Sequence, residues 1–114
     1  MGGHIVVRRL SKLTTSGVVD RITMDAYPDD VHIEWRRIMA RVVGADCTLI
    51  EIGVKSGKSD YPMRSQKVTN VGQSVSVTTP MWGSGDYQIY AEFTTTTIGE
   101  MMELTSFGRR EHVV

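Results

Sequence analysis

Apolar and polar residues alternate along most of this chain with a period of two, which is the spacing of side chains on the two faces of a β-strand. The clearest case is the segment 87–95, in which Tyr87, Ile89, Ala91 and Phe93 would share one face. Comparable segments, bounded by turns rich in Gly, Pro, Asp and Asn, are expected at 18–25, 47–54, 61–68, 73–79 and 100–108.

The segment 31–44 is the longest element and allows two interpretations. Apolar residues occupy alternate positions up to Trp35, and the phase then shifts by one residue around Arg36 and Arg37. A β-bulge at these two arginines would produce such a slip. Several of the same apolar residues also fit a helical period. We favour one long, bulged strand, because the first half has a clear period of two.

About seven or eight short strands joined by turns predict an all-β fold, an antiparallel β-sandwich of jelly-roll-like form. The length of 114 residues suits one domain. We assign 18–114 to the sandwich and 1–17 to an extended N-terminal arm. The arm contains a possible short strand followed by a polar, turn-rich stretch. It is equally consistent with a strap that docks on a neighbouring subunit and with an ordinary edge strand.

The charge balance argues against nucleic acid as a partner. Lys plus Arg and Asp plus Glu both number 13, whereas nucleic-acid binding usually shows as a basic excess. Three arginine doublets, at 8–9, 36–37 and 109–110, have no interleaved aromatics and suggest strand edges or interface ion pairs. A chain of zero net charge also lacks the repulsion that keeps monomers apart, which mildly favours a partner-bound state.

No apolar stretch approaches the roughly 20 residues of a membrane-spanning helix. The N-terminal residues lack the charged and apolar regions of a signal peptide. We therefore expect synthesis in a cytoplasm and no membrane partner.

Candidate chemistry is sparse. Cys47 is the single cysteine and lies in an apolar stretch, so the sequence predicts a buried, inert thiol and no intramolecular disulfide. His4, His32 and His112 are far apart and have no zinc-type spacing. We expect neither a metal nor any other cofactor.

Two possible catalytic patterns also fail. The segment 57–59 reads Gly-Lys-Ser, but a phosphate-binding loop would need a glycine at position 52, which is Ile52. Glu92, Glu100 and Glu103 could in principle supply a glycosidase pair, yet solvated residues on outer faces are the simpler interpretation. We expect a protein that is not an enzyme.

Aromatic and aliphatic residues supply the candidate binding positions. Trp82 in the glycine-rich loop 80–86, with Tyr87 and Tyr90 nearby, could form a sugar-stacking platform, or Trp82 could cover the core or meet a partner subunit. The aliphatic run in the arm is the other candidate surface. The candidate interface or ligand residues are Ile5, Val6, Val7, Trp82, Tyr87 and Tyr90.

Several short features come together between residues 31 and 108. They are Trp35 in a long strand, the segment 47–54, Tyr61-Pro62 opening the next strand, and a last hairpin with Tyr90-Ala91-Glu92-Phe93, Gly99-Glu100, Glu103-Leu104 and Phe107-Gly108. This pattern resembles small β-sandwich virion proteins of tailed bacteriophages, which serve as capsid decoration or cement proteins or as head-vertex components.

The resemblance implies a non-enzymatic virion protein that binds the major capsid protein or another virion protein as a homo-oligomer. Many weak contacts on a symmetric lattice would then act together. The resemblance implies no individual site residue. A carbohydrate-binding sandwich module and a phage tail or fibre component remain the alternatives.

Overall fold

The computed structural model describes residues 4–15, 18–27, 31–44, 46–78, 81–83 and 86–112, with the backbone alone at 4, 31, 81, 82, 111 and 112. These ranges contain nine strands and no helix. The strands are β1 (His4–Leu13), β2 (Val19–Thr23), β3 (Val31–Val43), β4 (Cys47–Ser56), β5 (Ser59–Lys67), β6 (Val75–Val77), β7 (Met81–Gly83), β8 (Tyr87–Thr95) and β9 (Met101–His112).

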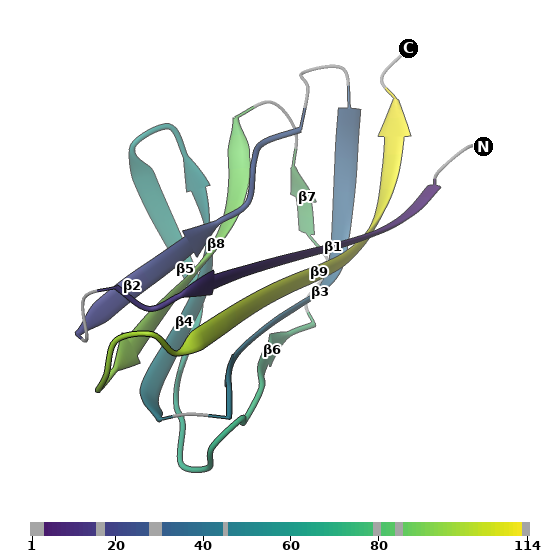
Figure 1. The fold of residues 1–114 in the computed structure, drawn as a ribbon. Helices are drawn as coiled ribbons and strands as arrows, with labels where there is room; N and C mark the ends of the chain where they lie inside the picture. Colours follow the sequence, from purple (N-terminus) through teal and green to yellow (C-terminus); the bar gives the residue numbers. More distant parts are fainter. Residues whose placement is uncertain are drawn as a thin grey trace.

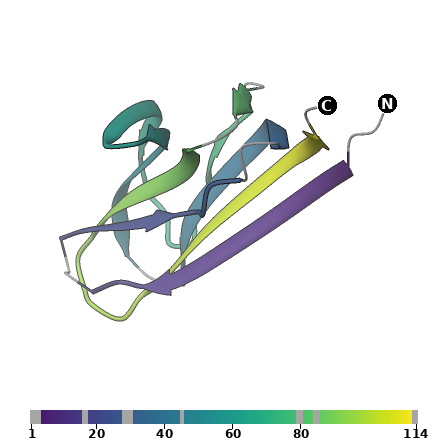
Figure 2. The ribbon, with the colours of Figure 1, turned by 90° about the horizontal axis from the view of Figure 1, so that it is seen from above.

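The strands form two antiparallel sheets that pack face to face (Figures 1 and 2). One sheet has the order β1-β9-β3-β6, with β7 also paired to β3, and the other has the order β2-β8-β4-β5. β6 pairs with Ile38–Ala40 and β7 pairs with Ile33–Trp35, so together they occupy one strand position. Counted this way, the fold has eight strand positions in two sheets of four. The predicted jelly-roll-like β-sandwich is confirmed.

The core lies between the two sheets and comes from alternate residues of each strand. Ile50 and Ile52 of β4, Phe93 of β8, and Met102 and Leu104 of β9 are fully buried. Because side chains alternate across a strand, the residues between them face outward. Each sheet therefore has an outer face whose composition the core does not dictate.

The long strand β3 carries the expected bulge. Its pairing with β9 shifts register between Trp35 and Arg37, which leaves Arg36 as the extra residue. The shift returns Ile38 to the core side, where Trp35 also lies. The strand interpretation of 31–44 and the position of the bulge are both confirmed.

A second register shift changes the expected face of Cys47. Strict alternation would place Thr48 on the core side with Ile50 and Cys47 on the outside. The pairing of β4 with β8 slips between Cys47 and Leu49, so Cys47 is buried and Thr48 is exposed. Burial raises the pKa of the thiol, and Sγ donates a hydrogen bond to the Leu49 carbonyl at 3.3 Å. The prediction of a buried thiol is confirmed.

The described part of the N-terminal segment is an edge strand within the sandwich. β1 pairs with β9 over its whole length, from His4 opposite Arg110 to Leu13 opposite Met101 (Figure 1). Its pairing makes β1 part of the first sheet rather than an arm outside the domain. Residues 1–3 and 16–17, which complete the proposed arm, lie outside the described residues.

The proposed loop 80–86 contains a short strand. β7 pairs with β3, and Gly83 lies against the Trp35 ring so closely that a Cβ added there would be 2.3 Å from Trp35 Cζ3. Only glycine leaves room for the indole to pack into the core at this point. Positions 80, 84 and 85, and 28–30 of the turn expected after β2, lie outside the described residues.

Candidate interaction face

The outer face of the β1-β9-β3 sheet concentrates positive charge. Among the described side chains it carries two glutamates, Glu34 and Glu103, against a larger number of arginines, an excess of three positive charges. We call this surface the arginine face, and its arginines are Arg9, Arg36, Arg37, Arg41 and Arg109. They come from three strands that the register places side by side.

The two glutamates lie beneath arginines. Arg36 Nε lies 2.8 Å from Glu34 Oε1, and Arg41 Nε lies 2.9 Å from Glu103 Oε1. The arginine side chains are 60% and 45% exposed, whereas both glutamate side chains are 18% exposed. The surface that meets solvent is therefore cationic, although each carboxylate is paired.

Two further arginines on this face make no ion pair within the described ranges. Arg9 lies opposite Thr105, and Arg37 lies opposite Phe107 on the other side of β9. Both side chains are exposed. A guanidinium presents five N–H donors in a planar fork suited to a carboxylate. Arg9 and Arg37 are thus available to a partner.

Exposed aliphatic side chains lie at both ends of this arginine band. At one end Ile5 is 88% and Val7 is 56% exposed. At the other end Leu13, Met101 and Val43 form a row across the three strands, and all three are exposed. Contiguous exposed apolar groups are typical of interaction sites rather than of free surfaces.

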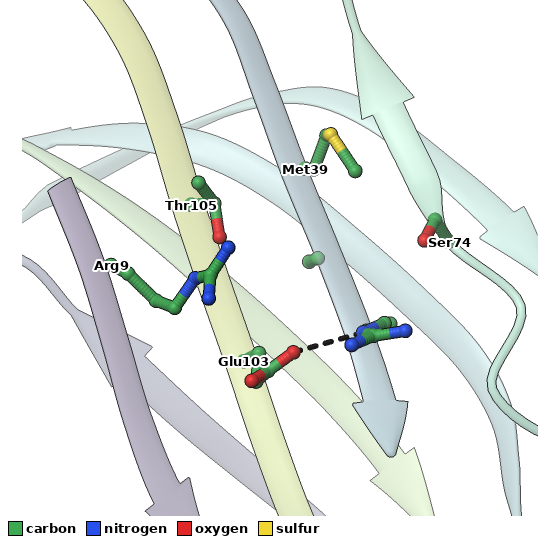
Figure 3. Close-up of a pocket in the computed structure, with 7 residues that line it drawn as sticks. Arg9, Met39, Ser74, Glu103 and Thr105 are labelled. Atoms are coloured by element: carbon green, nitrogen blue, oxygen red, sulfur yellow. Dashed lines mark hydrogen bonds and ion pairs between the residues drawn. The ribbon is translucent and has the colours of Figure 1, made fainter. Parts of the chain in front are cut away.

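A shallow hollow of about 250 Å³ lies within the arginine face. Figure 3 shows Arg9 reaching from β1 over β9 toward Thr105 and Glu103, with Met39 on the far side. The hollow contains one carboxylate, and that carboxylate is already paired with Arg41. Its lining can receive an anionic group but offers no nucleophile with an adjacent base.

The structure divides the six candidate residues between several locations. Ile5 and Val7 point outward on the arginine face, whereas Val6 points inward and packs against the core. Trp82 pairs through its backbone with Glu34, and its side chain lies outside the described set. Tyr87 is exposed beside Gly83, where an added Cβ would be 3.0 Å from its ring.

Tyr90 is not the exposed ring that a sugar platform would need. It lies on the outer face of the β2-β8-β4-β5 sheet but is 0% exposed. The Arg21 guanidinium covers the ring at 4.1 Å from its centroid, and the ring occupies the space left by Gly53 on the neighbouring strand. Tyr90 Oη donates to Glu51 Oε2 at 3.0 Å. The proposed grouping of Trp82, Tyr87 and Tyr90 is wrong at Tyr90.

Arg21 organises this second outer face. Its Nη2 lies 2.7 Å from Asp60 Oδ2 and 2.8 Å from Glu92 Oε2. The hydrogen bond from Arg21 lowers the pKa of Asp60. Burial, followed by the hydrogen bond to Glu51, raises the pKa of Tyr90. Each carboxylate of the cluster therefore has a partner within the sheet.

The acidic residues considered as a catalytic pair are separated by the fold. Glu92 and Glu103 lie on opposite outer faces of the sandwich, and Glu100 lies in the connection between β8 and β9. Within the described ranges, no three His, Cys, Asp or Glu side chains are placed to hold a metal ion. The same ranges contain no helix long and apolar enough to cross a membrane.

Comparison with known proteins identifies the fold but no family. No protein-family model and no curated protein matches this chain. A solved structure from Bacillus endospore appendages, a novel family of disulfide-linked pili, aligns with 100% of this chain and 93% of its own with a TM-score of 0.52. The two sequences are 16% identical, so the likeness concerns the fold alone.

Proposed function

We propose that this chain is a non-enzymatic structural subunit that works by binding other proteins in an assembly. The observation that carries the proposal is the row of exposed aliphatic side chains on β1 and its neighbours, led by Ile5 and Val7. Removing apolar area from water contributes about 25 cal/mol per Å², so a contact that covers these side chains would favour association. In an assembly the same side chains would be covered.

The edge strands of the two sheets also indicate that association occurs at β1. β1 is ten residues long and pairs on one side only among the described strands; it carries three cationic residues, Arg8, Arg9 and Lys12, but contains neither a proline nor a register shift. β5, an edge of the other sheet, contains Pro62 and a register shift beside Gly53. Proline and bulges blunt an edge against strand pairing, whereas a long regular edge invites it. Association is therefore expected at β1.

The finer role that we propose is decoration or cementing of a virion capsid. It rests on the sequence resemblance over 31–108, together with an outer face suited to docking on a shell. The partner would be the major capsid protein or another virion protein, and the chain would act as a homo-oligomer. It would be made in the host cytoplasm and incorporated into the virion.

A fibre subunit is the second candidate, favoured by the shared fold with the appendage protein. Those pili are disulfide-linked, whereas this chain has a single cysteine that is buried. A fibre built from it would depend on non-covalent contacts. The chain would then resemble the appendage subunit in architecture and differ from it in how copies are joined.

Sedimentation of the purified chain over a range of concentrations, with electron microscopy of the products, tests the proposal. We expect self-association that Leu10→Lys weakens about tenfold, because a charge on an exposed edge opposes strand pairing. Val71→Lys adds the same charge at an exposed turn and serves as the control. A chain that stays monomeric throughout would contradict the proposal. Closed oligomers that bind capsids support decoration, whereas open filaments support a fibre.

A further inference from the structure

We infer that the arginine face docks on an acidic, partly apolar protein surface of a different molecule, and not on a second copy of this chain. The inference rests on the proposed function and adds the chemistry of the partner. Its basis is the combination of excess arginine, carboxylates covered by guanidinium groups, and flanking aliphatic side chains.

The positive charge of this face indicates that the partner's surface is negatively charged. The chain as a whole is neutral, yet this face has five arginines against two glutamates among its described side chains. Arg9 and Arg37 are exposed without an ion pair, and they lie on neighbouring rows of the sheet. Charge-assisted hydrogen bonds between guanidinium and carboxylate groups are stronger than neutral ones. A partner with carboxylates at matching positions would use both arginines.

The hollow in the arginine face could bind one carboxylate of the partner. Arg9, Arg41 and Thr105 are among the residues that line it, and Figure 3 shows the Arg9 guanidinium beside the Thr105 hydroxyl. Its volume of about 250 Å³ is enough for an aspartate or glutamate side chain to enter from above. The Arg9 guanidinium would then gain the carboxylate partner that Arg41 already has in Glu103.

A second copy of the chain does not fit this face. A two-fold contact would place the arginine face against itself, and like charges across an interface are unfavourable. The outer face of the other sheet is no better as an occupant. Asp60 and Glu92 are engaged by Arg21, and Glu51 accepts from Tyr90. Because each of these carboxylates already accepts from a donor within the sheet, this face attracts a new arginine less strongly than unpaired carboxylates would.

The aliphatic flanks favour a protein over a nucleic acid. Proteins recognise single-stranded nucleic acids with cations for the phosphates and aromatic rings for the bases. Ile5, Val7, Leu13, Val43 and Met101 cannot stack on bases and gain little from a phosphate chain, and Phe107, an aromatic residue on this face, is only partly exposed. Apolar contacts surrounding or adjoining arginine are, in contrast, usual in protein interfaces.

The test compares two variants with the same change of four charge units. Arg9→Glu/Arg37→Glu alters the arginine face, and Lys58→Glu/Lys67→Glu alters exposed positions at the β4–β5 turn and the end of β5. The probes are a fluorescent peptide of alternating glutamate and leucine and a fluorescent oligothymidylate, with binding followed by anisotropy. Circular dichroism and unfolding in urea verify that each variant is folded.

We expect the acidic peptide to bind the wild type and to bind the arginine-face variant at least about tenfold more weakly, with less than about a twofold change in the control. Equal losses in both variants would overturn the inference, because they would reflect net charge alone. Oligothymidylate bound more tightly than the peptide would overturn it in favour of a nucleic acid.

Absence of peptide binding to the folded wild type would also overturn the inference. The proposed function has a separate readout, since self-association through β1 is measured by sedimentation of the same preparations. An arginine face that binds nothing, in a chain that still self-associates, would remove the acidic partner and leave the structural role in place.

Discussion

The two outer faces of the sandwich are both built from antiparallel strands, but they differ in how their charged side chains are paired. On the β2-β8-β4-β5 sheet, Arg21 pairs with Asp60 and Glu92 and covers the Tyr90 ring. On the arginine face, guanidinium groups outnumber carboxylates and aliphatic side chains meet solvent. One face satisfies its polar groups internally, whereas the other leaves Arg9 and Arg37 without an ion pair among the described residues.

This difference separates stability from binding within one small domain. Polar groups that satisfy one another contribute to the folded state, so changing them should alter the free energy of unfolding. Exposed groups without internal partners contribute little to folding and are free to specify an interface. Substitutions on the two faces should therefore affect different measurements.

The largest loss of stability is expected from Gly53→Val. A Cβ at this position would lie 2.5 Å from Tyr90 Oη and 2.6 Å from the Tyr61 carbonyl oxygen. Because one of these atoms belongs to the backbone, side-chain rotation alone cannot relieve the clash. We expect the free energy of unfolding in urea to fall by about 3 kcal/mol. Ser65→Val, an exposed change on the same sheet, should have little effect, and similar losses in both would contradict this explanation.

Arg21→Met should have the next largest effect on stability. We expect the free energy of unfolding to fall by about 1 kcal/mol, because the substitution removes two ion pairs and the contact with the Tyr90 ring. Arg21 lowers the pKa of Asp60, so its stabilisation through Asp60 is present above the ordinary Asp pKa of 3.8 and is lost as pH falls through the lowered value.

Urea unfolding of the wild type and Arg21→Met between neutral and acid pH tests this dependence, with the Asp60 pKa measured by NMR. The difference between the two stability curves should narrow as the pH falls below the Asp60 pKa of the folded protein, and the part that comes from the contact of Arg21 with the Tyr90 ring should remain. An Asp60 pKa unchanged by the substitution would refute the assignment.

Tyr90→Phe should cost about 1 kcal/mol, because it removes the hydrogen bond to Glu51 and keeps the ring. The folded-state pKa of Tyr90 is raised, so the stability linked to its neutral form is present below the ordinary Tyr pKa of 10.0 and declines as pH rises above it. The phenylalanine variant should lose less stability than the wild type between pH 10 and pH 11. Tyr87→Phe, at an exposed position, is the control.

The smallest change in stability is expected on the arginine face. Arg9→Glu/Arg37→Glu should leave the free energy of unfolding within about 0.5 kcal/mol of the wild type, because neither side chain has an ion-pair partner within the described residues. The same variant should lose binding to the acidic peptide. A large loss of stability would show that this face, too, serves folding, and the contrast between the two faces would fail.

Local pattern was sufficient for much of the fold. Alternation predicts most strands, and the phase slip at Arg36 and Arg37 predicts the bulge in β3. β7 escapes the same reasoning because a strand of three residues is too short to show a period. The slip that turns Cys47 inward involves a single extra residue at a strand end, where the pattern has no preceding residues to define its phase.

The interaction face required information that local pattern does not carry. Arg9, Arg37 and Arg109 are distant in sequence and become neighbours only through the strand order β1-β9-β3. The net charge of the whole chain is zero, so it gives no sign of the local excess of positive charge on the arginine face. Tyr90 follows the alternation and faces outward as expected, yet it is buried because the register places Gly53 beside it. Strand order and register are long-range properties, and they decide both results.

The pairing of β1 with β9 also sets the order in which the chain can fold. His4 lies opposite Arg110, so the first described strand gains its neighbour only after β9, at the other end of the described residues, has been synthesised. Ile5 and Val7 remain on an unpaired segment until then, when strands of this kind are most prone to aggregate. Chains that terminate before β9 should leave β1 without its only described partner strand, and ribosome-bound intermediates should show β1 accessible to proteases until β9 has emerged from the ribosome.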